Sequence, residues 1–365
     1  MHMGNEVLSP SVALGFSVAS VSALAVCAKQ AQRKLEGRQL PLMGMMGALV
    51  FAAQMVNFQI LGGSSGHLGG GALLAIVLGP EVAVFVMSAV LFIQAVVFND
   101  GGLLALGTNI FNMGILPAFL GYGCFRLFVG REAFEAQSAG RVYLGCFVAG
   151  LLGVTAGAAM VPIQVGLSGL LQDGVSLSWF LATMTWVHLI IGAVEGVVTF
   201  LVVAYLYHAR ADLLPGGPKL TGRVSVSAVL ASLGVAALVA GCVISMLASG
   251  LPDGLEYVLG VEAADNAETG EGTDRSAGGR LIVREPAESS LMARTSAFQE
   301  RIAVLPDYTH PATGDAEEEQ PERLFQWDSF QAISGVTGSA LTLLLAFAIG
   351  RLLSRRAKAA AEATG

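Results

Sequence analysis

Long apolar runs separated by short polar loops occupy most of the chain. A transmembrane helix needs about 20 apolar residues, and by this measure seven runs are clear spans: residues 9–28, 41–61, 104–127, 141–166, 179–207, 224–249 and 334–353. Residues 68–98 are long enough for one tilted helix or for two short helices that break at Gly79-Pro80, because proline ends an ideal helix.

The distribution of basic residues decides between these two readings. Four short segments carry them: Lys29, Arg33, Lys34 and Arg38; Arg126, Arg131 and Arg141; His208, Arg210, Lys219 and Arg223; and Arg351, Arg355, Arg356 and Lys358. The positive-inside rule places such segments in the cytoplasm, and all four can lie there only if residues 68–98 cross twice. We therefore expect an all-α integral membrane protein of about nine spans, with an extracytoplasmic N-terminus and a cytoplasmic C-terminus in the plasma membrane.

The composition agrees with this class and divides the chain. Of the 365 residues 54% are hydrophobic and 13% are charged, while 17 of the 27 acidic residues lie between residues 250 and 330. We expect a seven-span bundle (1–210), a cytoplasmic linker (211–223), a two-span hairpin (224–355) with an extracytoplasmic acidic loop (250–333), and a cytoplasmic tail (356–365). The loop is rich in Ala, Gly, Glu and Pro, which predicts little order except near its ends.

Several motifs of other protein classes are missing. The sequence has no G-x-x-x-x-G-K-[ST] for ATP and no H-E-x-x-H, so we expect a protein that is not an enzyme. Its four cysteines, Cys27, Cys124, Cys146 and Cys242, lie in or beside apolar runs, which predicts unpaired thiols that pack in the interior.

Two histidines stand out as candidate metal ligands. His2 follows the initial methionine, and His67 lies in the glycine-rich loop of residues 62–71. The predicted topology places both on the outer side. An intact, ordered amino terminus, the amide nitrogen of residue 2 and its imidazole can chelate one metal ion in a plane.

These segments are similar to a known family. The family is the substrate-binding (S) component of nickel and cobalt energy-coupling-factor (ECF) transporters, NikM/CbiM, and the resemblance rests on Met1-His2, Pro41-Leu42-Met43-Gly44, residues 51–58, residues 65–70, Asp100-Gly101-Gly102 and residues 109–114. Residues 252–256, Pro-Asp-Gly-Leu-Glu, resemble the NikN or PDGLE-type partner, here fused to the same chain. The first resemblance covers roughly residues 1–210 and the second roughly 220–355.

The resemblance implies a metal site at the amino terminus. The ligands it implies are the amine of Met1, the amide and ring nitrogens of His2, and the ring of His67. Adjacent amine and amide nitrogens close a five-membered chelate ring, and the amide with the His2 ring closes a six-membered one. Planar nitrogen ligation suits Ni(II) or Cu(II), so Ni(II) is favoured over Co(II) as the transported substrate. Met3 departs from the family pattern and either packs or lies axial to the ion.

The family also implies partners. These are a coupling transmembrane protein (NikQ/CbiQ-like), a P-loop ATPase (NikO/CbiO-like) and membrane lipid, with no nucleic acid. Gly15, Ala19 and Ala23 form a small-residue stripe that either docks the coupling protein or, as the default, packs within the chain. Two alternative functions are a cobalt-specific homologue that serves cobalamin synthesis and a membrane metal receptor without translocation.

Other polar residues in the spans have two readings each. Gln54 with Asn57, and Asn109 with Asn112, are three residues apart and are expected to share a helix face. They either support the metal site through hydrogen bonds or make ordinary interhelical contacts. His188 and Glu195, seven residues apart, suit either a proton or metal relay or a structural pair with partners inside the bundle.

Overall fold

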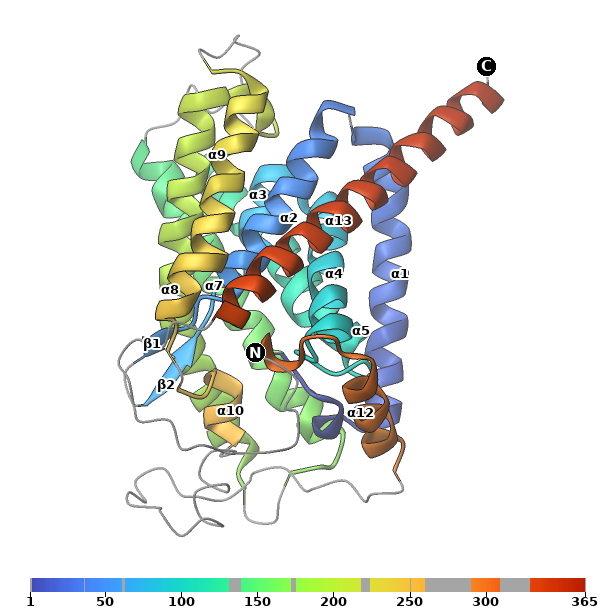
Figure 1. Ribbon diagram of the computed structural model, residues 1–365, viewed down its shortest axis with the longest axis vertical. Coiled ribbons are helices and arrows are strands. Elements are labelled where there is room, and N and C mark those ends of the chain that lie inside the picture. Colours follow the sequence, from blue (N-terminus) through green and yellow to red (C-terminus); the bar gives the residue numbers. More distant parts are fainter. Residues whose placement is uncertain are drawn as a thin grey trace.

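The structure is a computed structural model that describes residues 2–35, 37–60, 63–130, 139–171, 175–217, 224–249, 251–259, 290–308 and 329–364. It is an elongated helical bundle in which most long helices follow the long axis (Figure 1). Seven helical segments in these ranges are long and apolar enough to cross a membrane: Pro10–Arg33, Pro80–Val97, Leu106–Val129, Ala139–Leu167, Leu177–Leu213, Val226–Leu247 and Phe330–Arg355. The protein is therefore a multi-pass membrane protein, as expected.

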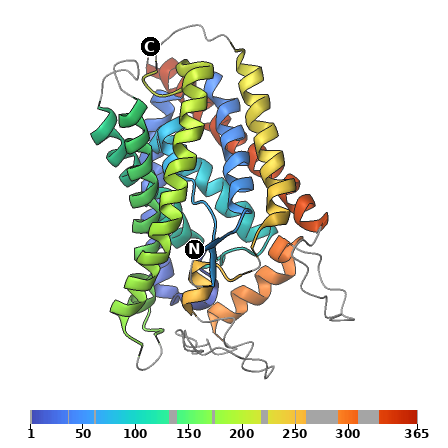
Figure 2. The same ribbon diagram turned by 90° about the vertical axis from the view of Figure 1, so that its left-hand side faces the viewer.

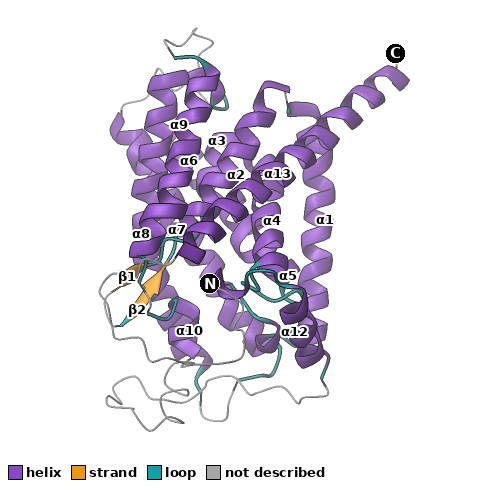
Figure 3. Ribbon diagram, viewed as in Figure 1, coloured by secondary structure: helices purple, strands orange, loops and turns teal. Residues whose placement is uncertain are grey.

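The second predicted span is shorter than the sequence suggested. Helix α2 covers Leu40–Gln54, and the chain then forms an antiparallel hairpin of β1 (Phe58–Ile60) and β2 (Ser64–Gly66). The expected span 41–61 is thus wrong beyond Gln54, because a short apolar run does not distinguish a buried strand from a helix. Figure 3 shows this hairpin at the end of the bundle where the N-terminus lies.

The apolar run of residues 68–98 forms two helices that break at Gly79-Pro80, as predicted. Helix α3 (Gly71–Leu78) and helix α4 (Pro80–Val97) meet at Gly79, whose φ of 86° lies in the left-handed region. His67 before α3 and Asp100 after α4 both lie against His2, so the chain must reverse between them. Helices α2 (15 residues) and α3 (8 residues) are apolar but shorter than the seven long segments of the described residues, so about nine spans require both of them to be short.

The helical segment Leu106–Val129 is wound irregularly. It begins with α5 (Leu106–Asn109), passes through two π-helical turns (Ile110–Ile115 and Pro117–Gly121) and ends with α6 (Tyr122–Val129). Proline lacks the N–H that an α-helical bond requires, and π-turns are frequent at functional sites. Asn112 lies in the first of these turns.

The two long helices of the second module, which is the predicted hairpin of residues 224–355, meet at one point and then diverge. Helix α9 (Val226–Leu238) and its π-helical continuation (Val239–Ile244) touch α13 (Ser329–Thr364) where Gly241 meets Gly335. Figure 1 shows α13 leaving α9 and crossing in front of α2. A Cβ added at Gly44 of α2 would lie 2.9 Å from the Leu343 carbonyl oxygen, so small residues allow the two backbones to approach closely.

The acidic loop contains more helix than expected. Helix α10 (Gly254–Leu259) lies at its beginning, and helix α12 (Leu291–Ile302) lies well inside it. The expectation that order is confined to the loop ends is therefore wrong for α12. This helix buries Met292 and Gln299, which are seven residues apart. The hydroxyl of Ser290 caps its first turn. Figure 2 shows α12 against the end of the bundle. Residues 260–289 and 309–328, with His310, lie outside the described residues.

Two long helices complete the bundle: α7 (Ala139–Leu167) and α8 (Leu177–Arg210). They pack through glycines, since a Cβ at Gly150 would lie 2.5 Å from the Gly196 nitrogen. Helix α1 (Pro10–Lys34) lies at the edge with most of its surface exposed. Of the small-residue stripe, Gly15 and Ala19 are exposed and Ala23 is half-buried, so the default that the stripe packs within the chain is wrong for Gly15 and Ala19. All four cysteines are free, as predicted.

Candidate metal site

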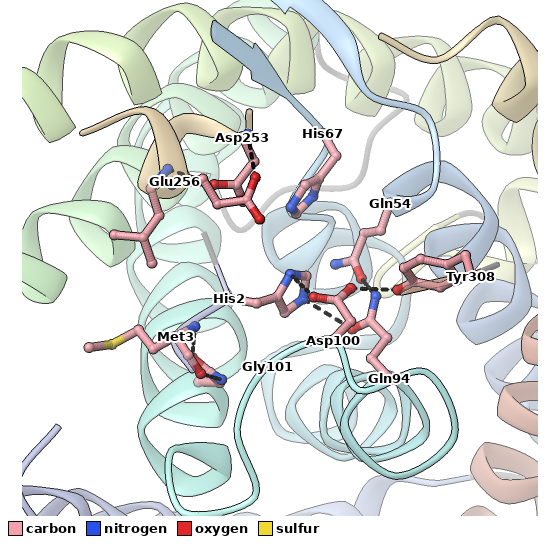
Figure 4. Close-up of polar contacts among 12 residues, drawn as sticks. His2, Met3, Gln54, His67, Gln94, Asp100, Gly101, Asp253, Glu256 and Tyr308 are labelled. Atoms are coloured by element: carbon pink, nitrogen blue, oxygen red, sulfur yellow. Dashed lines mark hydrogen bonds and ion pairs between the residues drawn. The ribbon is translucent and has the colours of Figure 1, made fainter. Parts of the chain in front are cut away.

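The two candidate histidines meet although 65 positions separate them. Their rings stack with centroids 5.1 Å apart and an interplanar angle of 19°. They line a cavity of about 530 Å³ at the N-terminal end of the bundle, which Figure 4 shows in close-up. Met1, the third predicted ligand, lies outside the described residues.

His2 is held at both ring nitrogens. Its Nε2 lies 3.1 Å from Gln94 Oε1, and its Nδ1 lies 3.1 Å from Asp100 Oδ1. Burial lowers the pKa of His2 to about 3 and raises the pKa of the Asp100 carboxyl. The lowered pKa of His2 favours the neutral ring, which is the form that binds a metal ion.

His67 is held by its own loop. Its Nδ1 lies 3.0 Å from the Leu68 carbonyl oxygen, an atom that can only accept a hydrogen bond. Burial lowers the pKa of His67 to about 4. The ring is therefore neutral at pH 7, and its Nε2 is free to bind a ligand.

The loop after His67 is fixed by two buried side chains. Glu195 Oε2 of α8 accepts hydrogen bonds from the backbone nitrogens of Gly69 (2.6 Å) and Gly70 (3.0 Å). Gln54 Nε2 donates to the Gly69 carbonyl oxygen (2.7 Å). Of the two readings of Gln54, support of the candidate site or an ordinary interhelical contact, this contact with the His67 loop agrees with the first.

The N-terminal segment is fixed by the two predicted asparagines. Asn109 makes two hydrogen bonds with Met3: its Oδ1 accepts from the Met3 nitrogen (2.9 Å) and its Nδ2 donates to the Met3 carbonyl (3.0 Å). Asn112 Nδ2 lies 3.7 Å from the Met3 sulfur. The two asparagines share a helix face, as expected. Met3 is fully buried, and its side chain points away from His2 in Figure 4.

Asn57 does not share a helix face with Gln54, because α2 ends at Gln54. That expectation is wrong. Asn57 instead follows the helix and lines the cavity, and its Oδ1 has no hydrogen-bond partner among the described residues.

The Pro-Asp-Gly-Leu-Glu segment forms a helix cap beside the histidines. Asp253 Oδ1 accepts from the nitrogens of Leu255 (2.7 Å) and Glu256 (2.9 Å), and Glu256 Oε2 accepts from the Asp253 nitrogen (2.8 Å). This reciprocal pair is a capping box that starts α10. A Cβ at Gly254 would lie 2.9 Å from Val187 Cγ1, so glycine lets α10 pack on α8.

The same segment continues the β-hairpin. The Pro252 carbonyl accepts from the Ser65 nitrogen (2.8 Å), and Ser65 forms a parallel bridge with Asp253. The capping box therefore holds residues of the second module against the loop that carries His67.

The cavity has an acidic lining. Glu6, Asp100, Asp253, Glu256 and Asp307 line it, and the described residues of its lining include neither lysine nor arginine. In the described residues no group of three or more His, Cys, Asp or Glu is arranged to hold a metal ion. A metal site here would therefore need nitrogen donors from the backbone in addition to the two rings.

Sequence reasoning missed several residues of the site. Gln94 carried a signal, as an uncharged polar residue in an apolar span, and Asp253 lies in the Pro-Asp-Gly-Leu-Glu motif, but nothing in the sequence placed Asp253 or Tyr308 of the distant acidic loop at this site. Tyr308 donates its hydroxyl hydrogen to Asp100 Oδ2.

His188 and Glu195 have separate partners. His188 Nδ1 lies 2.8 Å from the Met184 carbonyl, while Glu195 holds the His67 loop. Both are buried inside the bundle. Neither is therefore the hydrogen-bond partner of the other in the part of the chain that the structure describes.

Comparisons with known proteins identify the two modules. Residues 2–213 match the family model "Cobalt uptake substrate-specific transmembrane region" (CbiM), and residues 227–355 match the PDGLE domain. A protein from Haloquadratum walsbyi that carries the name of a metal transport protein is 38% identical over 59% of this chain and 93% of its own length.

Two further matches are similar. A protein from Archaeoglobus fulgidus that carries the name of a fused nickel transport protein, NikMN, is 37% identical over 66% of this chain and 76% of its own. A crystal structure described as that of a truncated transition metal transporter is 34% identical, covers 56% of this chain and 98% of that chain, and has a TM-score of 0.49. The relatives named here are transport proteins, not enzymes. With more than half of its residues matched by one family model, the chain belongs to the CbiM family of metal uptake proteins and carries a PDGLE domain fused behind it.

Proposed function

We propose that this protein captures Ni(II) outside the cell as the substrate-binding subunit of an ATP-driven ECF transporter. The ligands are the amino terminus of Met1, the backbone and ring nitrogens of His2, and the ring of His67. The observation that carries the proposal is the stacking of His2 and His67 at 5.1 Å, beside the start of the chain. Two chelate rings from the first two residues and one external imidazole complete a planar four-nitrogen set.

The ion and its entry follow from the same chemistry. Planar nitrogen ligation favours a d8 ion, so Ni(II) is preferred over Co(II), and neutral imidazoles suit either ion. The acidic lining of the cavity attracts cations before they reach the nitrogens. Relatives are named for nickel and the family model for cobalt, which makes the choice of ion a matter for experiment.

Partners supply the energy. The chain has no phosphate-binding P-loop, so a separate NikO/CbiO-like ATPase and a NikQ/CbiQ-like coupling protein drive release into the cytoplasm. The exposed small-residue stripe on α1 is the proposed contact with the coupling protein. The C-terminal ends of α1 and α8, beside which basic residues lie, are at the end of the bundle opposite the N-terminus (Figure 1), which supports an extracytoplasmic site.

Metal binding by the purified full chain tests the site. Four forms are compared by titration with Ni(II) and Co(II): the native chain, a chain extended by two residues before Met1, His67→Ala, and His208→Ala as a control on an exposed histidine of α8. The extension removes the primary amine from the chelate, so we expect the extended form and His67→Ala to lose at least tenfold in Ni(II) affinity. We expect His208→Ala to bind as the native chain does. Unchanged affinity in the extended form would overturn the proposed ligand set.

A second experiment distinguishes transport from reception. Cells that express the chain with its coupling protein and ATPase should accumulate Ni(II), and cells with an ATPase inactivated at its P-loop should not. Equal accumulation in both would instead support a receptor that does not translocate the ion.

A further inference from the structure

A chain of hydrogen bonds connects the two halves of the candidate site. It starts at the carbonyl oxygen of Gly69, which accepts from Gln54 Nε2 at 2.7 Å. Gln54 Oε1 accepts from Gln94 Nε2 at 2.8 Å, and Gln94 Oε1 lies 3.1 Å from His2 Nε2. Gln54 and Gln94 are buried, so water does not compete for these bonds.

The direction of the chain is fixed at its start. A backbone carbonyl can only accept, so Gln54 must present its NH₂ group to Gly69 and its oxygen to Gln94. Gln94 must then present its own NH₂ group to Gln54 and its oxygen to His2. An amide oxygen cannot donate, and consequently Nε2 of the His2 ring carries a hydrogen.

The chelate requires the other ring nitrogen, Nδ1, which faces Asp100 Oδ1 at 3.1 Å. The six-membered ring formed with the His2 amide closes through Nδ1 and not through Nε2, because only Nδ1 lies one bond beyond Cγ. For His67 the Leu68 carbonyl fixes the hydrogen on Nδ1 and leaves Nε2 free. Two successive carbonyls of one loop thus act on both rings, directly on His67 and through two glutamines on His2.

We propose that Gln54 and Gln94 are positioning residues that transmit the geometry of the Leu68-Gly69 loop to His2 and select the Nε2–H tautomer needed to bind the metal. This inference rests on the proposed function, because a tautomer matters to function only if His2 binds the ion through its ring. The consequence is that both imidazoles are prepared before the ion arrives, which reduces the cost of binding.

The test is ¹⁵N nuclear magnetic resonance of the full chain in detergent, without metal, at pH 7.5 and with ring-labelled histidine. We expect hydrogen on Nε2 of His2 and on Nδ1 of His67. We expect Gln94→Met and Gln54→Met each to convert His2 to a mixture of tautomers, since the first removes the acceptor and the second lets the Gln94 amide rotate.

Two histidines serve as internal controls. His67 and His188 are each fixed by a backbone carbonyl, so their tautomers should stay the same in both variants. We expect Ni(II) affinity to fall about two- to tenfold in Gln54→Met and Gln94→Met. In each variant a smaller fraction of the protein has the His2 tautomer that binds the ion, and one hydrogen bond is lost.

The outcomes separate this inference from the proposed function. Hydrogen on Nδ1 of His2 in the native chain, or an unchanged His2 tautomer in both variants, would overturn the inference even if the chain binds Ni(II) tightly. If the tautomers are as expected but the protein binds neither Ni(II) nor Co(II), the proposed function is overturned, and the hydrogen bonds through Gln54 and Gln94 have a structural role only.

Discussion

Single residues of the His67 loop are held by partners far away in the sequence. Glu195, 126 residues from Gly69, accepts two of the loop's backbone N–H groups with one carboxylate oxygen. In the sequence, a carboxylate in an apolar span indicated only that some interior partner exists. The pair of histidines could be predicted because ligand chemistry restricts the candidates, but the support of the loop required the fold.

Glu195→Ala should weaken the site through the loop. It leaves two buried backbone N–H groups without acceptors, at a cost of about 1–3 kcal/mol each. We expect a lower unfolding midpoint in detergent and at least a fivefold loss of Ni(II) affinity. Glu195→Gln keeps one acceptor oxygen and should fall between the native chain and the alanine variant. If Glu195→Ala matched the native chain in both measurements, the loop would not depend on this carboxylate.

Elements differ in how well their sequence determines them. The long spans could be predicted to within a few residues, since apolar length is the main constraint in a bilayer. Helix α2 and the hairpin after it could not, because Phe58–Ile60 is as apolar as a helix end and becomes a strand only by pairing with Ser64–Gly66. Helix α10 lies between these cases, since its capping box is visible in the sequence but its position on the site is not.

The capping box of α10 predicts different results for two substitutions at Asp253. Asparagine is also a good N-cap residue, so Asp253→Asn should keep α10 folded, whereas Asp253→Ala should destabilise it by about 0.5–2 kcal/mol. Hydrogen exchange of the α10 amides measures this, and we expect faster exchange only in the alanine variant. Faster exchange in both variants would mean that the charge of Asp253, and not its cap, stabilises the helix.

At the scale of the whole molecule the two modules share one hydrophobic core. Met43 and Phe51 of α2 and Ala346 and Leu353 of α13 belong to the same buried cluster. The sequence indicated a hairpin attached to a bundle, because adjacent spans with a connecting loop usually pack together. It did not indicate that α13 would pack on α2, since helix contacts in a membrane depend on where small residues face each other.

The contact between Gly241 and Gly335 provides a test of this arrangement. A Cβ at Gly335 would lie 2.1 Å from the Gly241 carbonyl oxygen, which is too close for any real contact, whereas a Cβ at Gly15 would meet nothing within 4 Å. Both glycines lie in membrane helices, so Gly335→Ala and Gly15→Ala change helix propensity equally. They differ in that the added methyl group meets a neighbouring backbone only at Gly335.

We expect Gly335→Ala to destabilise the protein by about 1–3 kcal/mol, as overpacking does, and Gly15→Ala to have no such effect. Thermal unfolding of the full chain in detergent measures the difference. Because α13 follows the acidic loop and Tyr308 of that loop donates to Asp100, displacement of α13 should also disturb the His2 surroundings and lower Ni(II) affinity in Gly335→Ala. Equal stability and affinity in the two variants would contradict the close crossing of α13 and the helix that continues α9.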